Sequence, residues 1–257
     1  MCILKVNNVS ISFGGLRAVS DVNLQLGKGE IVGLIGPNGS GKTTLLNIIS
    51  GIYTPDAGAI CLGNEEITAL PPHARAAKGI GRTFQIQNLF FAMTVLENVM
   101  IGLHKDMQTG VFSAAFRLGR VKTEEMIAKE KALEALKFFG LQKMADRMIT
   151  DLSSIEQRMV EIARVLVTDH SVILLDEPAA ALSPATVIQL GSLLKKIRDE
   201  KGASIILVEH VVSLVLDVSE RITVLNFGRV IAEGKPEEIK RDPAVLEAYL
   251  GKEGSYA

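Results

Sequence analysis

Residues 31–43 read Ile-Val-Gly-Leu-Ile-Gly-Pro-Asn-Gly-Ser-Gly-Lys-Thr, and this stretch decides the fold. Its first five residues form the apolar run of a buried strand, and the next eight fit the pattern G-x-x-x-x-G-K-[ST]. An amphipathic stretch over 42–50 follows directly. The sequence therefore predicts a strand, a glycine-rich loop and a helix in succession, which is the context in which this pattern binds phosphate.

The glycine-rich segment 36–43, here called the phosphate loop, has the chemistry of a nucleotide site. Glycines permit backbone conformations that other residues avoid, so successive N–H groups can converge on phosphate oxygens at a helix N-terminus. We expect Lys42 to reach the β- and γ-phosphates of ATP and the Thr43 hydroxyl to bind Mg²⁺. The predicted nucleotide contacts are Gly36, Pro37, Asn38, Gly39, Ser40, Gly41, Lys42, Thr43 and Thr44.

A second acidic site follows the apolar run 172–175, where Asp176 and Glu177 stand together. A buried parallel strand that ends in acids is common in α/β folds. Beside a phosphate loop, this pattern predicts that Asp176 holds Mg²⁺ and that Glu177 polarises the attacking water. The alternative is that both acids only cap the segment that follows them.

Short apolar runs alternate with amphipathic stretches along the chain, which is typical of an α/β domain. The predicted strands are 4–10, 22–26, 31–35, 59–62, 81–84, 172–175, 204–208, 221–226 and 230–233. The predicted helices are 42–50, 95–103, 123–139, 155–168, 184–200, 211–219 and 243–250. The region 86–168 shows no strand pattern and contains six of the nine Phe and seven of the eight Met. We therefore expect it to be a helical subdomain inserted into a single domain of residues 1–257.

Composition excludes several classes of protein. Among 257 residues, 47% are hydrophobic, which excludes a disordered chain. The 28 basic and 29 acidic side chains give a formal charge of −1, so we expect no nucleic acid and no anionic membrane surface as the main partner. No run approaches the roughly 18 apolar residues of a membrane span. Cys2 and Cys61 form no metal-like cluster and favour a reducing compartment.

Through these motifs, the chain from about Leu4 to Leu250 resembles the ATP-binding subunits of ABC transporters. The resemblance implies an α/β fold, namely a P-loop NTPase (ABC ATPase) core with an antiparallel β subdomain and an inserted helical subdomain. It places Phe13 where an aromatic ring stacks on adenine. It places Gln85 where a glutamine links the Mg²⁺ site to the membrane partner. It places His210 where a switch histidine contacts the γ-phosphate.

Two segments depart from the family pattern. The family signature is L-S-G-G-Q or L-S-Y-G-Q, whereas residues 152–156, here called the signature loop, read Leu-Ser-Ser-Ile-Glu. In the family dimer this loop caps the ATP of the opposite subunit, so Ser153 is an implied nucleotide contact. The spacing of Ser153 and Glu156 also fits a helix capping box. Ser183 stands where the family has Asp, and it can cap the helix predicted from Pro184.

Within the family, the segments 79–85, 94–99 and 242–251 are most similar to importers of branched-chain amino acids, and to the longer, G-type ATP-binding subunit of that system. The resemblance implies an ATP-hydrolysing subunit that energises import through membrane permease subunits. It further implies pairing with a second ATP-binding subunit and a peripheral location on the cytoplasmic face of the cell membrane. The Phe- and Met-rich subdomain, with Phe90 and Phe91, is then expected to face the permease.

Two other classes of protein stay open at this point. One is a soluble ABC-type ATPase that acts on nucleic acid or ribosomes, although the sequence shows no tandem cassette, long coiled-coil insertion or basic surface. The other is a nucleotide-binding subunit that does not hydrolyse ATP, which the altered signature loop would suit.

Overall fold

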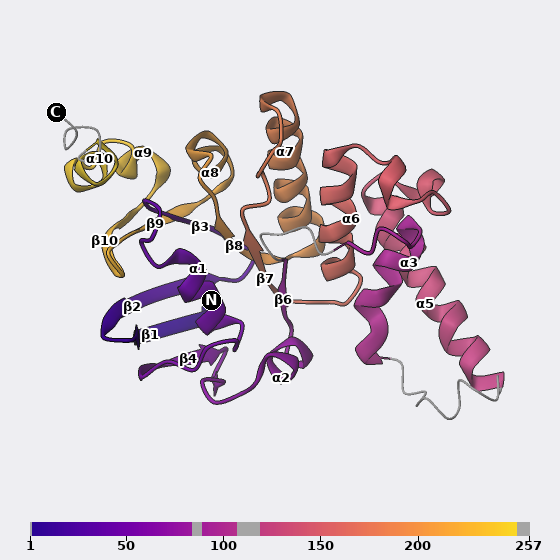
Figure 1. Ribbon diagram of the computed structural model, residues 1–257, viewed down its shortest axis with the longest axis horizontal. Helices are drawn as coiled ribbons and strands as arrows, with labels where there is room; N and C mark the ends of the chain where they lie inside the picture. Colours follow the sequence, from indigo (N-terminus) through magenta and orange to yellow (C-terminus); the bar gives the residue numbers. More distant parts are fainter. Residues whose placement is uncertain (1, 84–88, 107–118, 251–257) are drawn as a thin grey trace. The chain divides into compact units, whose positions relative to one another are not determined.

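The computed structural model describes residues 2–83, 89–106 and 119–250. They divide into two compact units (Figure 1). The first is Met1–Gln85 together with His170–Ala257, and the second is Ile86–Asp169. None of the helices in the described residues combines the length and the apolar character needed to cross a bilayer.

A six-stranded sheet forms the centre of the first unit, with strand order β10-β9-β3-β8-β7-β6. The strands are β3 (Ile31–Ile35), β6 (Ile80–Arg82), β7 (Val172–Asp176), β8 (Ser204–Val208), β9 (Arg221–Asn226) and β10 (Arg229–Gly234). All neighbours are parallel except β10, which runs antiparallel to β9. Every residue of β3, β7 and β8 is buried, so these strands are continuous apolar runs, as parallel strands covered on both faces require.

The register of this sheet brings the ends of three strands to one level. Val208 of β8 pairs with Leu34 of β3 and with Asp176 of β7. Because the strands are parallel, the loops that leave β3, β7 and β8 emerge at the same edge. The phosphate loop, Glu177 and His210 all belong to those loops.

The other sheet of the first unit is antiparallel, with order β2-β1-β4-β5. Its strands are β1 (Cys2–Phe13), β2 (Leu16–Gly27), β4 (Ala57–Leu62) and β5 (Glu65–Glu66). Helix α1 (Lys42–Ile49) contacts both β2 and β7. One apolar core is built from this helix and both sheets, and its buried members include Leu4, Leu24, Val32, Leu34, Leu45, Ile49, Val208 and Leu225.

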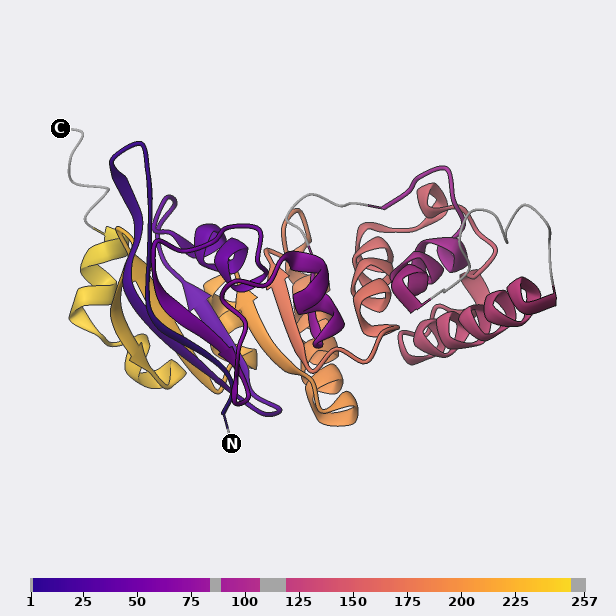
Figure 2. The same cartoon turned by 90° about the horizontal axis from the view of Figure 1, so that it is seen from below.

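Alternation along β3 lets helices cover both faces of the six-stranded sheet. Val32 and Leu34 belong to the core beside α1, whereas Gly33 points the opposite way. A Cβ at Gly33 would lie 2.3 Å from a methyl carbon of Val215 in α8 (Val212–Val218), so glycine is what allows this helix to approach. Helices α9 (Pro236–Ile239) and α10 (Pro243–Leu250), yellow in Figure 2, pack against β10.

Helix α7 (Pro184–Lys201) begins at the cap predicted from sequence. Ser183 has extended backbone, and its hydroxyl oxygen accepts a hydrogen bond from the Thr186 N–H at 3.4 Å. Pro184 occupies the first turn, where no donor is lost. The helix ends at Gly202, whose φ of 62° is left-handed. The capping prediction for Ser183 is confirmed.

The second unit is built from helices around its own small core. They are α3 (Val95–Met100), α5 (Gly119–Phe138) and α6 (Ser154–Leu166), with short 3₁₀ segments at Ile101–Asp106, Gln142–Met144 and Ile149–Asp151. Helix α3 contacts both α5 and α6. The buried side chains include Val95, Val99, Ala132, Leu136, Val160, Ile162 and Ala163. In the described part of this unit, strand pairing is limited to one bridge between Thr94 and Met148.

Most predicted elements are confirmed, and three strands and one helix match to the residue, namely 31–35, 204–208, 221–226 and 243–250. Helix α2 (Pro72–Ala77), α9 and β5 were not predicted. The helix predicted over 95–103 is wrong at its end, because α-helical geometry stops at Met100 and a 3₁₀ segment continues from Ile101. The strand predicted over 81–84 is found at Ile80–Arg82; Thr83 is not in the strand, and Phe84 lies outside the described residues.

Candidate nucleotide-binding site

The phosphate loop wraps around the ammonium group of Lys42. Lys42 Nζ donates hydrogen bonds to the carbonyl oxygens of Gly36 at 2.8 Å and Pro37 at 2.9 Å, and it lies 3.3 Å from the Ser40 hydroxyl oxygen. The side chain is buried. Gly41, the residue before α1, has a φ of 103°, and a Cβ there would lie 2.6 Å from the carbonyl oxygen of Ala18. The loop therefore needs glycine at this position for both its conformation and its close approach to β2.

Two neighbouring segments brace the phosphate loop from one side. The Gly228 N–H, in the turn between β9 and β10, donates to the Ser40 carbonyl at 2.9 Å. The Gly228 carbonyl in turn accepts a hydrogen bond of 2.8 Å from the Ser20 N–H of β2. The loop is thus tied to both sheets of the first unit.

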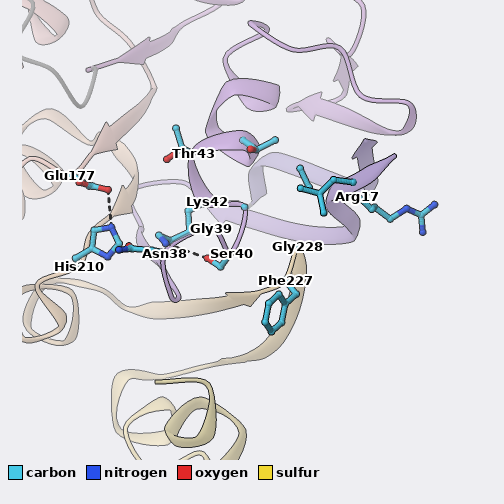
Figure 3. Close-up of a pocket in the computed structure, with 14 residues that line it drawn as sticks. Arg17, Asn38, Gly39, Ser40, Lys42, Thr43, Glu177, His210, Phe227 and Gly228 are labelled. Atoms are coloured by element: carbon cyan, nitrogen blue, oxygen red, sulfur yellow. Dashed lines mark hydrogen bonds and ion pairs between the residues drawn. The ribbon is translucent and has the colours of Figure 1, made fainter. Parts of the chain in front are cut away.

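A cavity of about 820 Å³ opens beside this loop (Figure 3). It is lined by Leu16, Arg17, Ala18, Asn38, Gly39, Ser40, Gly41, Lys42, Thr43, Thr44, Glu177, His210, Phe227 and Gly228. The structure therefore brings most of the predicted phosphate-loop contacts together with Glu177 and His210. Gly36 and Pro37 do not line the cavity, but their carbonyl oxygens hold Lys42 in place.

Asp176, at the end of β7, is buried and paired with Arg82 of β6. The Arg82 Nη2 to Asp176 Oδ2 distance is 3.0 Å. Arg82 Nη1 also donates to Asn47 Oδ1 at 2.8 Å and to Ser50 Oγ at 2.7 Å, so the guanidinium joins α1 to β7. Burial raises the pKa of Asp176, and the Arg82 charge opposes that rise. Arg82 could not be identified as a site residue from local sequence, because its partner Asp176 lies 94 residues away along the chain.

The chemistry of Asp176 and Thr43 suits a magnesium ion, although of these two only Thr43 is among the residues that line the cavity. Asp176 Oδ1 is buried and has no hydrogen-bond partner among the described residues. Thr43 supplies a hydroxyl on the cavity wall. A carboxylate and a hydroxyl, with water completing the shell, are the oxygen ligands that Mg²⁺ prefers beside phosphates. Among the residues that the structure describes, no group of three or more His, Cys, Asp or Glu is arranged to hold a metal. Gln85, the other predicted magnesium contact, lies outside the described residues.

Glu177 and His210 form a hydrogen-bonded pair at the cavity wall. The distance from His210 Nε2 to Glu177 Oε1 is 2.9 Å (Figure 3). Glu177 has a φ of 49°, a left-handed conformation that is uncommon for a residue with a side chain. Its N–H donates to the Val208 carbonyl at 2.8 Å, which ties this strained residue to the end of β8. Strain of this kind is often found where a side chain is held for function.

Glu209 is a buried carboxylate that was not predicted as a site residue. It accepts hydrogen bonds from the backbone N–H groups of Ala179 at 2.5 Å, His210 at 3.1 Å and Val211 at 3.4 Å. Burial raises the pKa of Glu209, and these hydrogen bonds partly oppose the rise. Glu209 therefore holds the segment after Glu177 against the segment that carries His210. In the sequence, Glu209 could have been recognised as a candidate because it directly follows the apolar run 204–208.

The aromatic residue that lines the cavity is Phe227, whereas Phe13 was predicted to stack on adenine. Phe13 is 44% exposed and does not line the cavity, and its ring meets that of Tyr53 edge-on with centroids 5.2 Å apart. The cavity is lined instead by Phe227, which is 81% exposed, and by Leu16, which is 73% exposed. The adenine contact of Phe13 stays a prediction.

The signature loop lies in the second unit, where Ser153 is the N-cap of α6. The Ser153 N–H donates to Glu156 Oε2 at 2.8 Å, and the Ser153 hydroxyl lies 2.6 Å from the same oxygen. These hydrogen bonds lower the pKa of Glu156. The predicted capping box is confirmed, and the carboxylate of Glu156 turns back toward the start of its own helix. A nucleotide contact of Ser153 stays a prediction.

The chain is similar to known ATP-binding proteins, in agreement with the geometry of the cavity. The family model described as ABC transporter matches residues 19–180, and the model described as branched-chain amino acid ATP-binding cassette transporter matches residues 229–255. The chain is 41% identical over 250 residues to the high-affinity branched-chain amino acid transport ATP-binding protein LivG of Escherichia coli K12, covering 97% of this chain and 98% of that protein.

Two solved structures resemble this fold. One is the ADP conformation of an ATP-binding cassette of an ABC transporter, with a TM-score of 0.86, 35% identity and coverage of 98% of this chain and 99% of that one. The other is a dimeric post-hydrolysis state of an ATP-binding cassette bound to ADP and Pi, with a TM-score of 0.73, 33% identity and coverage of 91% and 99%. The chain belongs to the ABC transporter family of ATP-binding cassettes, in its branched-chain amino acid group.

Proposed function

We propose that this chain is the ATP-binding and ATP-hydrolysing subunit of an importer of branched-chain amino acids. The observation that carries the proposal is the cavity in which the phosphate loop faces the hydrogen-bonded pair of Glu177 and His210. The similarity to LivG supports the substrate class.

In the proposed mechanism, the phosphate loop binds the triphosphate through its backbone N–H groups and the Lys42 ammonium. The Lys42 hydrogen bonds to Gly36 and Pro37 keep the charge centred in the loop before ATP arrives, so little reorganisation accompanies binding. Thr43 and Asp176 would hold Mg²⁺, which neutralises charge that develops on the phosphates.

Glu177 orients and polarises the attacking water, and His210 holds the Glu177 carboxylate in position while its ring reaches toward the γ-phosphate. The distance of 2.9 Å between their polar atoms supports this division of roles. Glu177 and His210 are fixed by backbone contacts at the ends of β7 and β8, so the pair is held by the most buried strands of the first unit.

The proposed partners are permease subunits and a second ATP-binding subunit. Phe90 and Phe91 of the second unit are 48% and 49% exposed, as a surface for an apolar partner requires. Buried Asn98 holds this segment: its amide oxygen accepts from the Phe90 N–H at 2.8 Å, and its Nδ2 donates to the Phe90 carbonyl at 3.0 Å. Contact with the permease would keep the chain at the cytoplasmic face of the membrane, and the signature loop would cap ATP held by the second subunit.

The test is ATP turnover and amino-acid uptake in membranes that contain the permease. We expect Glu177→Gln to bind ATP normally and to lose at least a hundredfold in turnover, because general-base assistance contributes about 10²–10⁴-fold. Lys42→Ala is the matched control, and it should lose ATP binding itself. Unchanged turnover and uptake in Glu177→Gln would exclude the assigned base.

A further inference from the structure

Phe227 occupies a backbone conformation that aromatic residues avoid. Asn226 pairs with Arg229, so Phe227 and Gly228 form a two-residue hairpin loop with φ values of 45° and 77°. Two successive positive φ values define a type I′ turn, for which Asn, Asp or Gly is preferred. The ring of Phe227 is 81% exposed, so burial in the first unit does not offset the unfavourable backbone.

The position of this turn is fixed by the phosphate loop. Gly228 exchanges hydrogen bonds with Ser40 and Ser20, and a Cβ at Gly228 would lie 2.7 Å from the Ala18 carbonyl oxygen. The hairpin therefore cannot move away from the loop without breaking both bonds. Figure 3 shows Phe227 next to Gly228, and Phe227, Leu16 and Ala18 are all among the residues that line the cavity.

The cavity wall contains both polar and apolar residues, and the two groups suit different parts of a nucleotide. The phosphate loop, Glu177 and His210 supply charges and hydrogen-bonding groups, which suit a triphosphate. Leu16, Ala18 and Phe227 supply apolar surface, which suits the flat face of a base.

We propose that Phe227 contacts the purine base of the bound nucleotide and forms part of its binding platform. The inference rests on the proposed function, because it takes ATP as the ligand of this cavity. The contact would give a function to an aromatic residue that is exposed and has an unfavourable backbone conformation. Base–aromatic stacking of this kind corresponds to about a tenfold contribution to affinity.

The experiment compares two ligands on the purified full chain by titration calorimetry, namely ATP and inorganic tripolyphosphate. We expect Phe227→Asn to weaken ATP binding about tenfold and to leave tripolyphosphate binding unchanged, whereas Phe227→Tyr keeps wild-type affinity for both. Asn suits the positive φ, so Phe227→Asn should also unfold at the same or a higher temperature than the wild type.

Each other result overturns the inference. If Phe227→Asn binds ATP as the wild type does, the ring makes no contact with the base. Equal losses for ATP and tripolyphosphate would mean that Phe227 only supports the phosphate loop. Phe13→Ala is the matched control: a loss of ATP affinity in that variant alone would place the base on Phe13. A wild-type chain that binds neither ligand would instead refute the proposed function.

Discussion

Asp176 is a buried carboxylate whose ion pair with Arg82 joins three elements of the first unit. The pair spans β6 and β7, and Arg82 also donates to Asn47 of α1 and to Ser50, the residue that follows α1. Two charges buried together cost desolvation energy, and removal of one leaves the other without compensation. The same carboxylate is the proposed magnesium ligand; burial raises its pKa, and the Arg82 charge opposes that rise and orients the carboxylate.

Replacement of Arg82 by Met should therefore lower the free energy of unfolding by about 3–5 kcal/mol. The reason is that Asp176 loses its adjacent cation while staying buried. The double variant Arg82→Met with Asp176→Asn is the matched control, and it should recover most of the lost stability. Urea unfolding of the nucleotide-free protein measures both. A loss below about 1 kcal/mol in the single variant would contradict the argument.

Glu209 makes stability depend on pH in a predictable direction. Burial raises its pKa, so the folded protein keeps the proton to a higher pH than the unfolded chain does. As pH rises from the usual carboxyl value through that raised pKa, unfolding releases a proton, and the contribution of Glu209 to stability falls. Wild type should therefore lose stability relative to Glu209→Gln over this window.

The measurement is the free energy of unfolding as a function of pH for both proteins. Glu156→Gln provides a comparison of opposite sign, because hydrogen bonds from Ser153 lower the pKa of Glu156. Its carboxylate stabilises the fold above the usual carboxyl pKa, and that contribution is lost as pH falls through the lowered value. Parallel pH profiles for wild type and Glu209→Gln would show that Glu209 does not titrate differently on folding.

At the scale of single elements, capping explains why α3 and α6 begin where they do. Thr94 and Glu97 form a capping box at α3, and Ser153 and Glu156 form one at α6. At α3 the N–H groups of Val95 and Leu96 already donate to the carbonyl oxygens of Arg147 and Ala145, and the box adds partners for the N–H groups of Thr94 and Glu97. At α6 the Ser153 N–H donates to Glu156. The family departure at Glu156 is thus compatible with a well-formed helix start.

Ser153→Ala should lower the free energy of unfolding by about 1 kcal/mol, because the hydrogen bond from the Ser153 hydroxyl to Glu156 at the start of α6 is lost. Thr94→Ala is the matched control at α3, with a similar expected loss. Denaturant unfolding measures both variants. If Ser153→Ala also changed ATP turnover in the assembled transporter while Thr94→Ala did not, a role of Ser153 beyond the cap would be supported; equal turnover would leave Ser153 a cap alone.

Elements with a strong pattern could be predicted, and elements set by tertiary contact could not. Strand β3 is an apolar run, β8 is nearly one, and β9 contains the apolar residues Ile222, Val224 and Leu225; all three match to the residue. Helix α2 has only six residues, too few to show a period. In the site, the phosphate loop and the acids after β7 are local patterns. Arg82 and Glu209 act through partners 94 and 30 residues away, which no local pattern contains.

At the scale of the whole molecule, the near-neutral chain has two units with separate cores and separate tasks in the proposed function. The first holds the nucleotide cavity. The second exposes Phe90 and Phe91 on a segment that Asn98 anchors. A formal charge of −1 suits attachment to a protein partner better than attachment to anionic lipid.

Substitution of Phe90 and Phe91 by Asp should abolish amino-acid uptake while ATP affinity of the purified chain stays at the wild-type value. Both rings are about half exposed, so the free energy of unfolding should change little. The readouts are uptake into vesicles, ATP binding and co-purification with the permease. Met126→Asp, at another exposed apolar residue of the second unit, is the matched control and should keep uptake. Wild-type uptake in the double variant would remove this segment from the interface.

Strands β3, β7 and β8 end at the same level of the sheet. This arrangement has a consequence for local unfolding of the protein. Amide protons in these three strands are shielded on both faces, so we expect them to exchange with solvent only when the first unit unfolds globally. The phosphate loop, Glu177 and His210 are attached at that slowest-exchanging layer. We therefore expect the points at which these three loops join the sheet to stay in place when the periphery of the first unit opens, even where the loops themselves move.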